Sequence, residues 1–316
     1  MERGVSATIS VVRPGILTTV QDRGRRGYQG LGVPVAGPMD WYSHQLANQL
    51  AGNDASAAAL EVTLIGPELQ SDADVECAVA GAAFDLTIDG QVVSSDRAFV
   101  LPAGARLRFG ARRRGARATL AFAGGIDVPA TFGSRATHLV SRMGPFGGRQ
   151  LTAGDRVTIG ARAAGTPRVG APLPLPDGHA RIRVLPAPHR ARFTDRAWTL
   201  LTGSRFLVTP QSNRMGYRLD GPALPHVSGA DILSEATPIG SIQVPSSGQA
   251  ILLMADRQTT GGYAVIATAI TADLPLAGQL APGDSIEFIA CARDEALEAL
   301  RERVASLAGD AGPVAG

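Results

Sequence analysis

Residues 84–93 of this chain read Phe84-Asp85-Leu86-Thr87-Ile88-Asp89-Gly90-Gln91-Val92-Val93. Asp89-Gly90 lies between two β-favouring runs and is typical of a two-residue hairpin turn, because that turn needs positive φ at both central positions. Similar short runs recur along the chain, separated by turns that use many of its 38 glycines and 21 prolines. The pattern predicts a mainly β protein. The other predicted strands cover residues 8–12, 75–80, 98–101, 106–109, 119–122, 182–185, 205–209, 250–254, 265–270 and 285–289.

Two segments depart from the β pattern and are predicted to be helices. Asp40 is placed to cap a helix that runs to about Ala51, and Gly52 is placed to end it. The tail, residues 294–307, is rich in Ala, Leu, Glu and Arg. We expect it to be an amphipathic helix that packs against the C-terminal β domain. Its predicted apolar face consists of Ala296, Leu297, Leu300 and Val304.

A Gly- and Pro-rich stretch without periodicity, residues 160–180, is typical of a domain linker. It predicts an N-terminal β domain over residues 1–165, a linker over 166–180 and a C-terminal domain over 181–316. Two pairs of segments resemble each other across this stretch, which favours two related β domains. Gly66-Pro67-Glu68-Leu69 matches Gly221-Pro222-Ala223-Leu224, and Ala153-Gly154-Asp155-Arg156-Val157 matches Pro282-Gly283-Asp284-Ser285-Ile286.

The basic residues of the chain are all arginine, because the sequence contains no lysine. This excludes a lysine Schiff base, a catalytic lysine, a Walker A motif and biotin attached to this chain. A formal net charge of +2 provides no strong field for nucleic acid, so no nucleic-acid partner is expected. The run Arg112-Arg113-Arg114 is interpreted as a solvated loop or strand end rather than a phosphate site.

Several other classes of protein are disfavoured by what the sequence lacks. No apolar run is long enough to cross a bilayer, and the N-terminus has no signal-peptide core, so we expect a cytoplasmic protein without membrane contact. The five histidines show no metal-ligand spacing, and Cys77 and Cys291 are isolated, so no metal ligand is expected. A Gly-x-Ser-x-Gly nucleophile elbow is also missing, although a triad assembled in space stays open.

A first polar segment, residues 18–40, combines Asp22 with arginines and closely spaced glycines. Such a loop can hold a carboxylate or a phosphate through bidentate arginine contacts, with the acid orienting an arginine. The helix that begins near Asp40 adds the positive end of its dipole. A purely structural salt-bridge loop explains the same composition equally well.

A second group of polar segments follows apolar strand residues in the C-terminal half. These segments are residues 211–219, Ser234-Glu235, residues 240–245 and residues 255–263. Strand ends are where a β scaffold displays a site. Their Asn, Gln and Thr side chains suit a small neutral amide, and Asp256 or Glu235 can act as general base. The alternative is that Asp256 only fixes the glycine turn that follows it.

These segments also carry a resemblance to a known family, over residues 8 to 295. The chain resembles the family called 5-oxoprolinase C-subunit, allophanate hydrolase subunit 2 or KipA, and is similar to the carboxyltransferase region of urea carboxylase. The resemblance rests on Thr19-Val20-Gln21-Asp22-Arg23-Gly24-Arg25, Gly32-Val33-Pro34, Met39-Asp40, Gly66-Pro67, Ala123-Gly124-Gly125-Ile126, Ser212-Asn213-Arg214-Met215-Gly216-Tyr217-Arg218-Leu219, Ile242-Gln243-Val244-Pro245 and Asp256-Arg257-Gln258-Thr259-Thr260-Gly261-Gly262-Tyr263.

The resemblance implies two cyclophilin-like β-barrel domains and a smaller KipI-type partner, called the 5-oxoprolinase B-subunit or allophanate hydrolase subunit 1. It also implies a third component, the A-subunit, and ATP-driven opening of a lactam to glutamate, with the ATP handled by the complex. The matched positions become candidate site residues. The catalytic candidates are Asp256 and Glu235, and the substrate-binding candidates are Gln21, Asp22, Arg25, Asn213, Arg214, Arg218, Gln243, Gln258, Thr260 and Tyr263.

The leading hypothesis is therefore a hydrolase subunit of an ATP-dependent 5-oxoprolinase, active only in its complex. Asp256 and Glu235 would orient water or the lactam nitrogen. The remaining roles are assigned by side-chain chemistry, and the two polar regions are expected to meet in one pocket against a second polypeptide. The amide would be hydrogen-bonded by Asn213, Gln243 and Thr260. The substrate carboxylate would be bound by Arg214 and Arg218.

Two alternatives remain at this stage. One is carboxyl transfer to urea or a related amide from biotin carried by another chain. The other is non-catalytic binding of a KipI-type kinase inhibitor. Many family members read Gly-Gly-Tyr-Pro-Lys where this chain has Gly261-Gly262-Tyr263-Ala264-Val265. The missing lysine removes a natural charge partner for a carboxylate, and this counts against carboxyl transfer.

Overall fold

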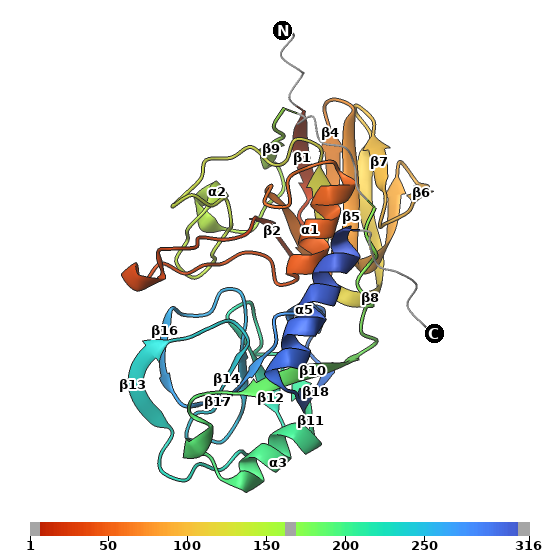
Figure 1. Ribbon diagram of the computed structural model, residues 1–316. Coiled ribbons are helices and arrows are strands. Elements are labelled where there is room, and N and C mark those ends of the chain that lie inside the picture. Colours follow the sequence, from red (N-terminus) through yellow and green to blue (C-terminus); the bar gives the residue numbers. More distant parts are fainter. Residues whose placement is uncertain (1–6, 162–168, 309–316) are drawn as a thin grey trace. The chain divides into compact units, whose positions relative to one another are not determined.

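The computed structural model describes residues 7–161 and 169–308 and divides the chain into two compact units (Figure 1). Of the described residues, unit 1 holds 7–25, 36–161, 169–175 and 304–308, and unit 2 holds 26–35 and 176–303. Both units are built mainly from strands, which confirms the predicted mainly β class. Residues 166–168 of the expected linker lie outside the described ranges. None of the described helices is long and apolar enough to span a membrane.

Unit 1 contains a nine-stranded sheet organised around one long antiparallel pair, β5 and β8. Six strands follow the order β2-β3-β8-β4-β1-β9, and β5 pairs with β6, β7 and β8. Buried aliphatic and aromatic side chains such as Ile9, Leu60 and Phe122 form its core. Its elements are β1 (Thr8–Arg13), β2 (Leu17–Gln21), α1 (Trp41–Leu50), β3 (Ala59–Thr63), β4 (Glu68–Ser71), β5 (Val75–Ile88), β6 (Gln91–Val93), β7 (Ala98–Leu101), β8 (Arg106–Phe122), α2 (Pro145–Gly148) and β9 (Arg156–Thr158).

The long strands β5 and β8 replace four shorter strands that the sequence predicted. Each strand continues through the residues that were expected to separate two predicted strands. The β5–β8 pairing accommodates these extra residues by shifting register between Gly81 and Leu86. A bulge lets a strand bend without ending. Gly81 and Gly115, both at positive φ, therefore resemble turn residues in the sequence although they lie inside strands.

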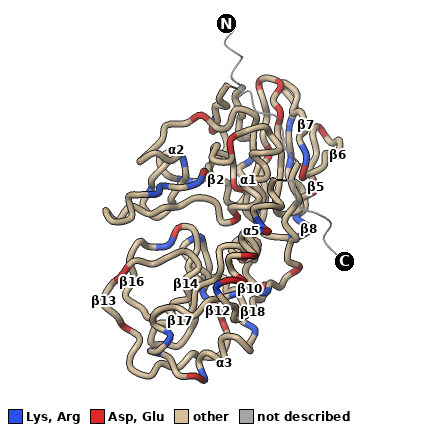
Figure 2. The backbone as a smooth tube through the Cα atoms, viewed as in Figure 1, with Lys and Arg blue, Asp and Glu red and all other residues tan. Residues whose placement is uncertain are grey.

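The arginine run lies in the exposed middle of β8, where Figure 2 marks basic residues in blue. Arg113 makes a bidentate contact with Asp85, with N···O distances of 2.5–3.1 Å. Arg112 donates to the carbonyl of Gly115 over 2.6 Å. The run is thus solvated, as interpreted, but it lies within a strand rather than at its end. Exposed ion pairs of this kind contribute little to stability.

The local signals in unit 1 are confirmed. Asp89 and Gly90 both have positive φ, 47° and 87°, and join β5 to β6. Asp40 caps α1, because its Oδ1 accepts a hydrogen bond from the Ser43 backbone N–H over 2.9 Å. Gly52, at φ 73°, follows the helix end as expected.

Unit 2 contains a closed barrel of seven strands in the order β10-β17-β14-β15-β12-β11-β18. Every neighbouring pair is antiparallel except β10 and β18. Phe206 and Phe288 pack in its core with ring centroids 5.8 Å apart. The barrel strands are β10 (His179–Pro186), β11 (Arg205–Val208), β12 (Gly216–Asp220), β14 (Ser241–Gln243), β15 (Ile251–Leu253), β17 (Val265–Ala269) and β18 (Ser285–Ala290).

A two-stranded ribbon of β13 (Asp231–Ala236) and β16 (Thr260–Tyr263) lies beside the barrel (Figure 1). Neither strand was predicted, because their polar and glycine-rich sequences resemble loops. Unit 2 also contains α3 (Asp195–Gly203) and α4 (Leu274–Gly278), and a short 3-10 helix, Gln29–Leu31, lies in the segment 26–35. The ribbon carries Glu235, Thr260 and Tyr263, three of the predicted site residues.

The C-terminal helix α5 (Arg293–Ala308) is confirmed, but only part of its predicted apolar face is buried. Ala296 and Leu300 pack with Ile270 and Ala272 of the barrel. Leu297 and Val304 are exposed, at 42% and 52%. The buried face is therefore rotated toward Ala299, which is 5% exposed.

One of the two internal matches, 153–157 with 282–286, corresponds to the same turn in both units. In unit 1 the Asp155 carboxylate accepts from Thr152 N, and in unit 2 the Asp284 carboxylate accepts from Ala281 N. In each turn the glycine N–H donates to a strand carbonyl, Val11 O or Val208 O, over 2.8 Å. Each turn then leads into a strand, β9 or β18. The two turns therefore share their hydrogen bonds as well as their Gly-Asp sequence.

We expect Gly154→Ala and Gly283→Ala each to lower the free energy of unfolding by about 1 kcal/mol, because each forces an alanine into positive φ. The φ angles are 89° and 94°, and neither added Cβ would meet an atom within 4 Å. Thermal unfolding should therefore show two similar losses of about 2–4 °C. Gly203→Ala, which also points into open space but lacks positive φ, is the control. A loss at only one turn would contradict their equivalence.

Candidate functional site

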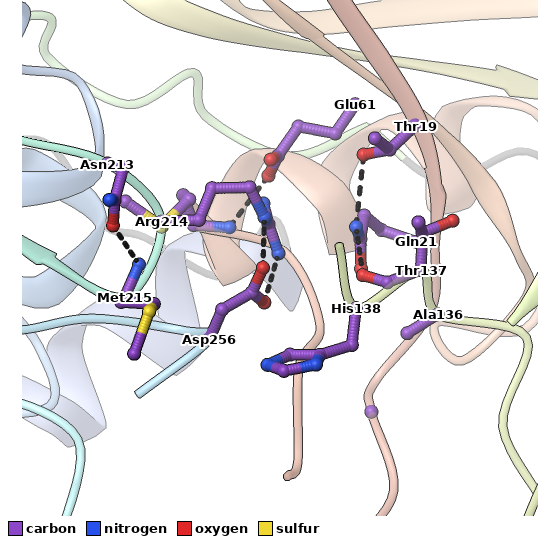
Figure 3. A network of polar contacts seen from close by, with 12 residues as sticks. Thr19, Gln21, Glu61, Ala136, Thr137, His138, Asn213, Arg214, Met215 and Asp256 are labelled. Carbon is purple, nitrogen blue, oxygen red and sulfur yellow. Dashed lines mark hydrogen bonds and ion pairs between the residues drawn. The ribbon is translucent and has the colours of Figure 1, made fainter. Parts of the chain in front are cut away.

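Gln21 is the best-packed of the predicted site residues in unit 1. It ends β2 and is fully buried, and its Nε2 donates to Thr19 Oγ1 over 3.0 Å and to Thr137 O over 3.1 Å (Figure 3). Its Oε1 and the hydroxyl of Thr137 are buried without a hydrogen-bond partner among the described residues. Unpaired buried polar atoms are costly, so they mark positions that a water or a ligand can satisfy.

Asp22 and Arg25 both fasten the loop around residues 131–137. The Asp22 carboxylate accepts from Ser134 Oγ and Arg135 N, each over 2.5 Å, and from Gly24 N over 2.9 Å. The Arg25 guanidinium is fully buried and donates to the carbonyls of Thr131 and Ala136. These contacts favour the structural interpretation of residues 22–25 that the sequence left open. Both charged side chains are hydrogen-bonded to backbone groups of the protein.

His44 is a buried residue of this region that the sequence did not single out. Burial lowers the pKa of its imidazole to about 4, while the charge of Asp22 works in the opposite direction. The ring is therefore neutral near pH 7. Its Nε2 lies 3.3 Å from Asn48 Nδ2, and its Nδ1 has no partner among the described residues. A histidine within a helix pattern looks like any other core residue, so no sequence signal marks it.

The central feature of the candidate site in unit 2 is a buried ion pair between Arg214 and Asp256. Nε of Arg214 donates to Oδ2 over 3.0 Å and Nη2 donates to Oδ1 over 2.9 Å (Figure 3). The two side chains are only 4% and 2% exposed. Asp256 N also donates to Arg214 O over 2.8 Å. Arg214, the predicted substrate-binding cation, and Asp256, the predicted base, therefore form an ion pair with each other.

The turn at residues 256–261 carries a set of amide contacts next to this pair. Thr237 Oγ1 donates to Gln258 O over 2.6 Å, and Gln258 Nε2 donates to Gln243 Oε1 over 3.3 Å. Gln243 is buried at the end of β14, and its Nε2 has no partner among the described residues. A Cβ on Gly261 would lie 2.5 Å from that Nε2. Glycine is required there because the backbone passes directly beside the amide.

Arg257 and His189 are further polar residues of this region. Arg257 Nε donates to Thr237 O over 2.8 Å. Burial, with the charge of Arg26 as the smaller cause, lowers the pKa of its guanidinium to about 10, so it stays cationic at neutral pH. His189 Nε2 lies 3.3 Å from Glu235 Oε1. The sequence gave His189 no role, because this contact bridges distant segments.

The other predicted residues of unit 2 are more exposed. Asn213 Oδ1 accepts from Met215 N over 2.8 Å and shapes the turn before β12 (Figure 3). Arg218 is exposed on β12 between buried Tyr217 and Leu219, so it points away from the barrel core. Thr260 and Tyr263 lie at the ends of β16 and are exposed. The meeting of the two predicted polar regions in one pocket stays a prediction.

Together, the region around Gln243 can recognise a small polar neutral group beside a fixed cation. Gln243 offers an unengaged donor, Glu235 offers a carboxylate that is half exposed, and Arg257 offers positive charge. Within residues 7–161 and 169–308, no three His, Cys, Asp or Glu side chains gather as metal ligands would. The chemistry that this arrangement supports is hydrogen bonding and proton transfer at an amide.

Comparison with known proteins shows similarity to carboxyltransferase domains. A family model described as carboxyltransferase domain, subdomain A and B, matches residues 31–290. The 5-oxoprolinase C-subunit of Escherichia coli (strain K12) is 38% identical over 295 residues, which cover 93% of this chain and 95% of that protein. Urea amidolyase of Saccharomyces cerevisiae (strain ATCC 204508 / S288c) is 31% identical over 302 residues, covering 89% of this chain and 16% of that protein.

A solved structure of similar fold is the crystal structure of the K. lactis urea amidolyase. It superposes with a TM-score of 0.92 at 29% sequence identity, covering 97% of this chain and 20% of that much longer one. The architecture of one closed barrel and one open sheet of strands is thus shared with a domain of a larger enzyme.

Breaking the Arg214–Asp256 pair should destabilise unit 2. We expect Asp256→Ala to lower the free energy of unfolding by about 3–5 kcal/mol, because it leaves a buried guanidinium without its carboxylate. The double variant Arg214→Met with Asp256→Leu removes both charges and should recover most of this loss. Thermal unfolding of the wild type, the single variant and the double variant measures the effect. A double variant no more stable than Asp256→Ala would contradict the account.

The close approach at Gly261 gives a second prediction, with its own control in the next residue. Gly261→Ala should lower the free energy of unfolding by about 1–3 kcal/mol, because the methyl group overlaps Gln243 Nε2 and Thr237 Cγ2. Gly262→Ala should be tolerated, since its Cβ would meet nothing closer than Ser234 Oγ at 3.5 Å. Thermal unfolding again provides the measurement. Equal effects of the two substitutions would show that the Gln243 contact is unimportant.

Proposed function

The chain belongs to the carboxyltransferase-domain family, and on that premise we propose that it is one subunit of a multi-subunit, ATP-dependent 5-oxoprolinase. In this reaction the complex opens the lactam of 5-oxoproline to glutamate. One water is added across the C–N bond of the lactam, and a second is consumed when ATP is hydrolysed. The chain would act only with its partners, among them a smaller KipI-type subunit and a third component.

Two observations support this proposal. A relative that carries the name 5-oxoprolinase C-subunit is similar over 93% of the chain and 95% of its own length. The chemical support for the proposal is the buried Nε2 of Gln243, because this donor has no hydrogen-bond partner among the described residues. A lactam carbonyl is the acceptor that such a donor can bind, and a neutral amide suits a site where donor and acceptor are themselves amides.

The proposed roles differ from the sequence-based ones where the contacts require it. Arg214 is engaged by Asp256, so the substrate carboxylate is assigned instead to Arg257. Arg257 is a partly buried cation whose pKa is lowered by burial and by the nearby charge of Arg26. Gln243 would bind the lactam carbonyl, and Gln258 would orient Gln243 through its Nε2. ATP is assigned to the complex as a whole, because the absence of lysine excludes a Walker A motif from this chain.

Carboxyl transfer to urea or a related amide is the second candidate, and the similarity to the K. lactis urea amidolyase favours it. It requires biotin carried by another chain, because there is no lysine here to modify. Position 265, where many relatives have lysine, is a valine that is buried at the start of β17. No side-chain cation is available at that position to pair with a carboxylate, so we rank this reaction second.

The test is reconstitution of the complex from this chain, its KipI-type partner and the third component. With 5-oxoproline and ATP, we expect glutamate and ADP to form in equal amounts, and omission of this chain should abolish both. Urea with bicarbonate, ATP and a biotinylated carrier protein is the parallel assay for carboxyl transfer. An intact three-part complex that releases no glutamate would refute the proposal.

A further inference from the structure

His189 and Glu235 form a pair beside the Gln243 amide that the proposed roles above do not use. His189 Nε2 lies 3.3 Å from Glu235 Oε1, and the histidine side chain is 17% exposed. His189 precedes the 3-10 helix Arg190–Arg192, and Glu235 lies on the ribbon strand β13. The contact therefore joins the ribbon to the segment that follows β10.

The second ring nitrogen of His189 fixes the direction of this contact. Val265 N donates to His189 Nδ1 over 3.3 Å, so Nδ1 is an acceptor and carries no proton. In the neutral form of the ring the proton then lies on Nε2, the nitrogen that faces Glu235 Oε1. With Nδ1 hydrogen-bonded and Nε2 facing Glu235 Oε1, His189 is placed to act on a ligand through that carboxylate, by holding it in one position.

The pairing of the ribbon places Glu235 on the same face as the Gln243 amide. Glu235 lies directly opposite Gly261 in the antiparallel pair β13–β16. Side chains of directly opposed residues point to the same face of a sheet. A Cβ on Gly261 would point at Gln243 Nε2, 2.5 Å away, so the side chain of Glu235 extends over that same face.

Asp256, the other acid predicted at this site, is engaged differently. Both of its carboxylate oxygens accept hydrogen bonds from the Arg214 guanidinium, and the side chain is 2% exposed. Glu235 is 50% exposed, and only its Oε1 faces His189. Of the two acids, Glu235 is the one with an oxygen available to a ligand.

We propose that Glu235 accepts the N–H of a lactam whose carbonyl is bound by Gln243 Nε2, and that His189 is the positioning residue that holds Glu235 for this contact. The inference rests on the proposed function and adds to it the group that recognises the lactam nitrogen. A site that binds the lactam N–H through a hydrogen bond should bind a lactam without this N–H more weakly, because the Glu235 carboxylate then loses its hydrogen-bond donor.

The probes are 5-oxoproline and its N-methyl derivative, which share the ring, the carbonyl and the carboxylate but differ in the N–H. Binding to the reconstituted complex is measured by titration calorimetry without ATP. We expect the wild type to bind 5-oxoproline at least about 10-fold more tightly, as loss of one charge-assisted hydrogen bond implies. His189→Phe should reduce this preference to less than about 3-fold, because Glu235 is no longer held.

Two variants separate positioning from a merely structural effect. His189→Gln should keep the preference, since an amide supplies a donor for Glu235 and an acceptor for Val265 N. His179→Phe is the matched control, because His179 also lies near a glutamate, with Nε2 3.7 Å from Glu287, but on the barrel strand β10. It should leave the preference unchanged.

The outcomes are distinguishable from those of the turnover assay. Equal binding of the two lactams by a complex that does release glutamate would overturn this inference alone. Full preference in His189→Phe, or an equal loss in His179→Phe, would also overturn it, and so would a wild-type complex that binds neither lactam. A complex that prefers the N–H lactam but releases no glutamate would instead refute the proposed function.

Discussion

The candidate site of unit 2 depends on the buried ion pair between Arg214 and Asp256. The pair joins the turn before β12 to the turn after β15 and continues the ladder between these strands, because Met254 N donates to Met215 O and Asp256 N to Arg214 O. Desolvating two charges is costly, and only bidentate geometry offsets the cost. Fixing Asp256 fixes the 256–261 turn, and this turn presents Gln258 and Gly261 to Gln243.

Most of the β architecture could be predicted from short-range signals. The Asp89-Gly90 turn and the Asp40 cap depend on neighbouring backbone geometry, which the local sequence determines. The bulges of β5 could not be predicted, because a glycine inside a bent strand looks like a turn. The face of α5 that is buried was only partly predicted, since the barrel surface, and not the helix, decides which apolar residues it covers.

The segments that were predicted to carry the site are rich in polar contacts, and the site itself stays a prediction. The segments that carry Gln21, Gln243 and Gln258 do hold interconnected or unsatisfied polar groups. The roles of the charged residues were harder to predict, because the role of a charged side chain depends on the group with which it pairs. Arg25 bonds to carbonyls more than 100 residues away, at Thr131 and Ala136, and His189 meets Val265 and Glu235 only after the barrel closes. Nothing in the local sequence encodes such distant contacts.

The loss of the family lysine at position 265 need not remove charge control from the site, because two other groups lie in the same region. Val265 still contributes its backbone N–H, which donates to His189 Nδ1 and leaves the histidine Nε2 facing Glu235. Arg257 supplies a cation whose Nε donates to Thr237 O. A guanidinium gives up a proton far less readily than an ammonium group. Under the proposed function, the arrangement would therefore be better suited to holding a carboxylate-bearing amide than to delivering protons during carboxyl transfer.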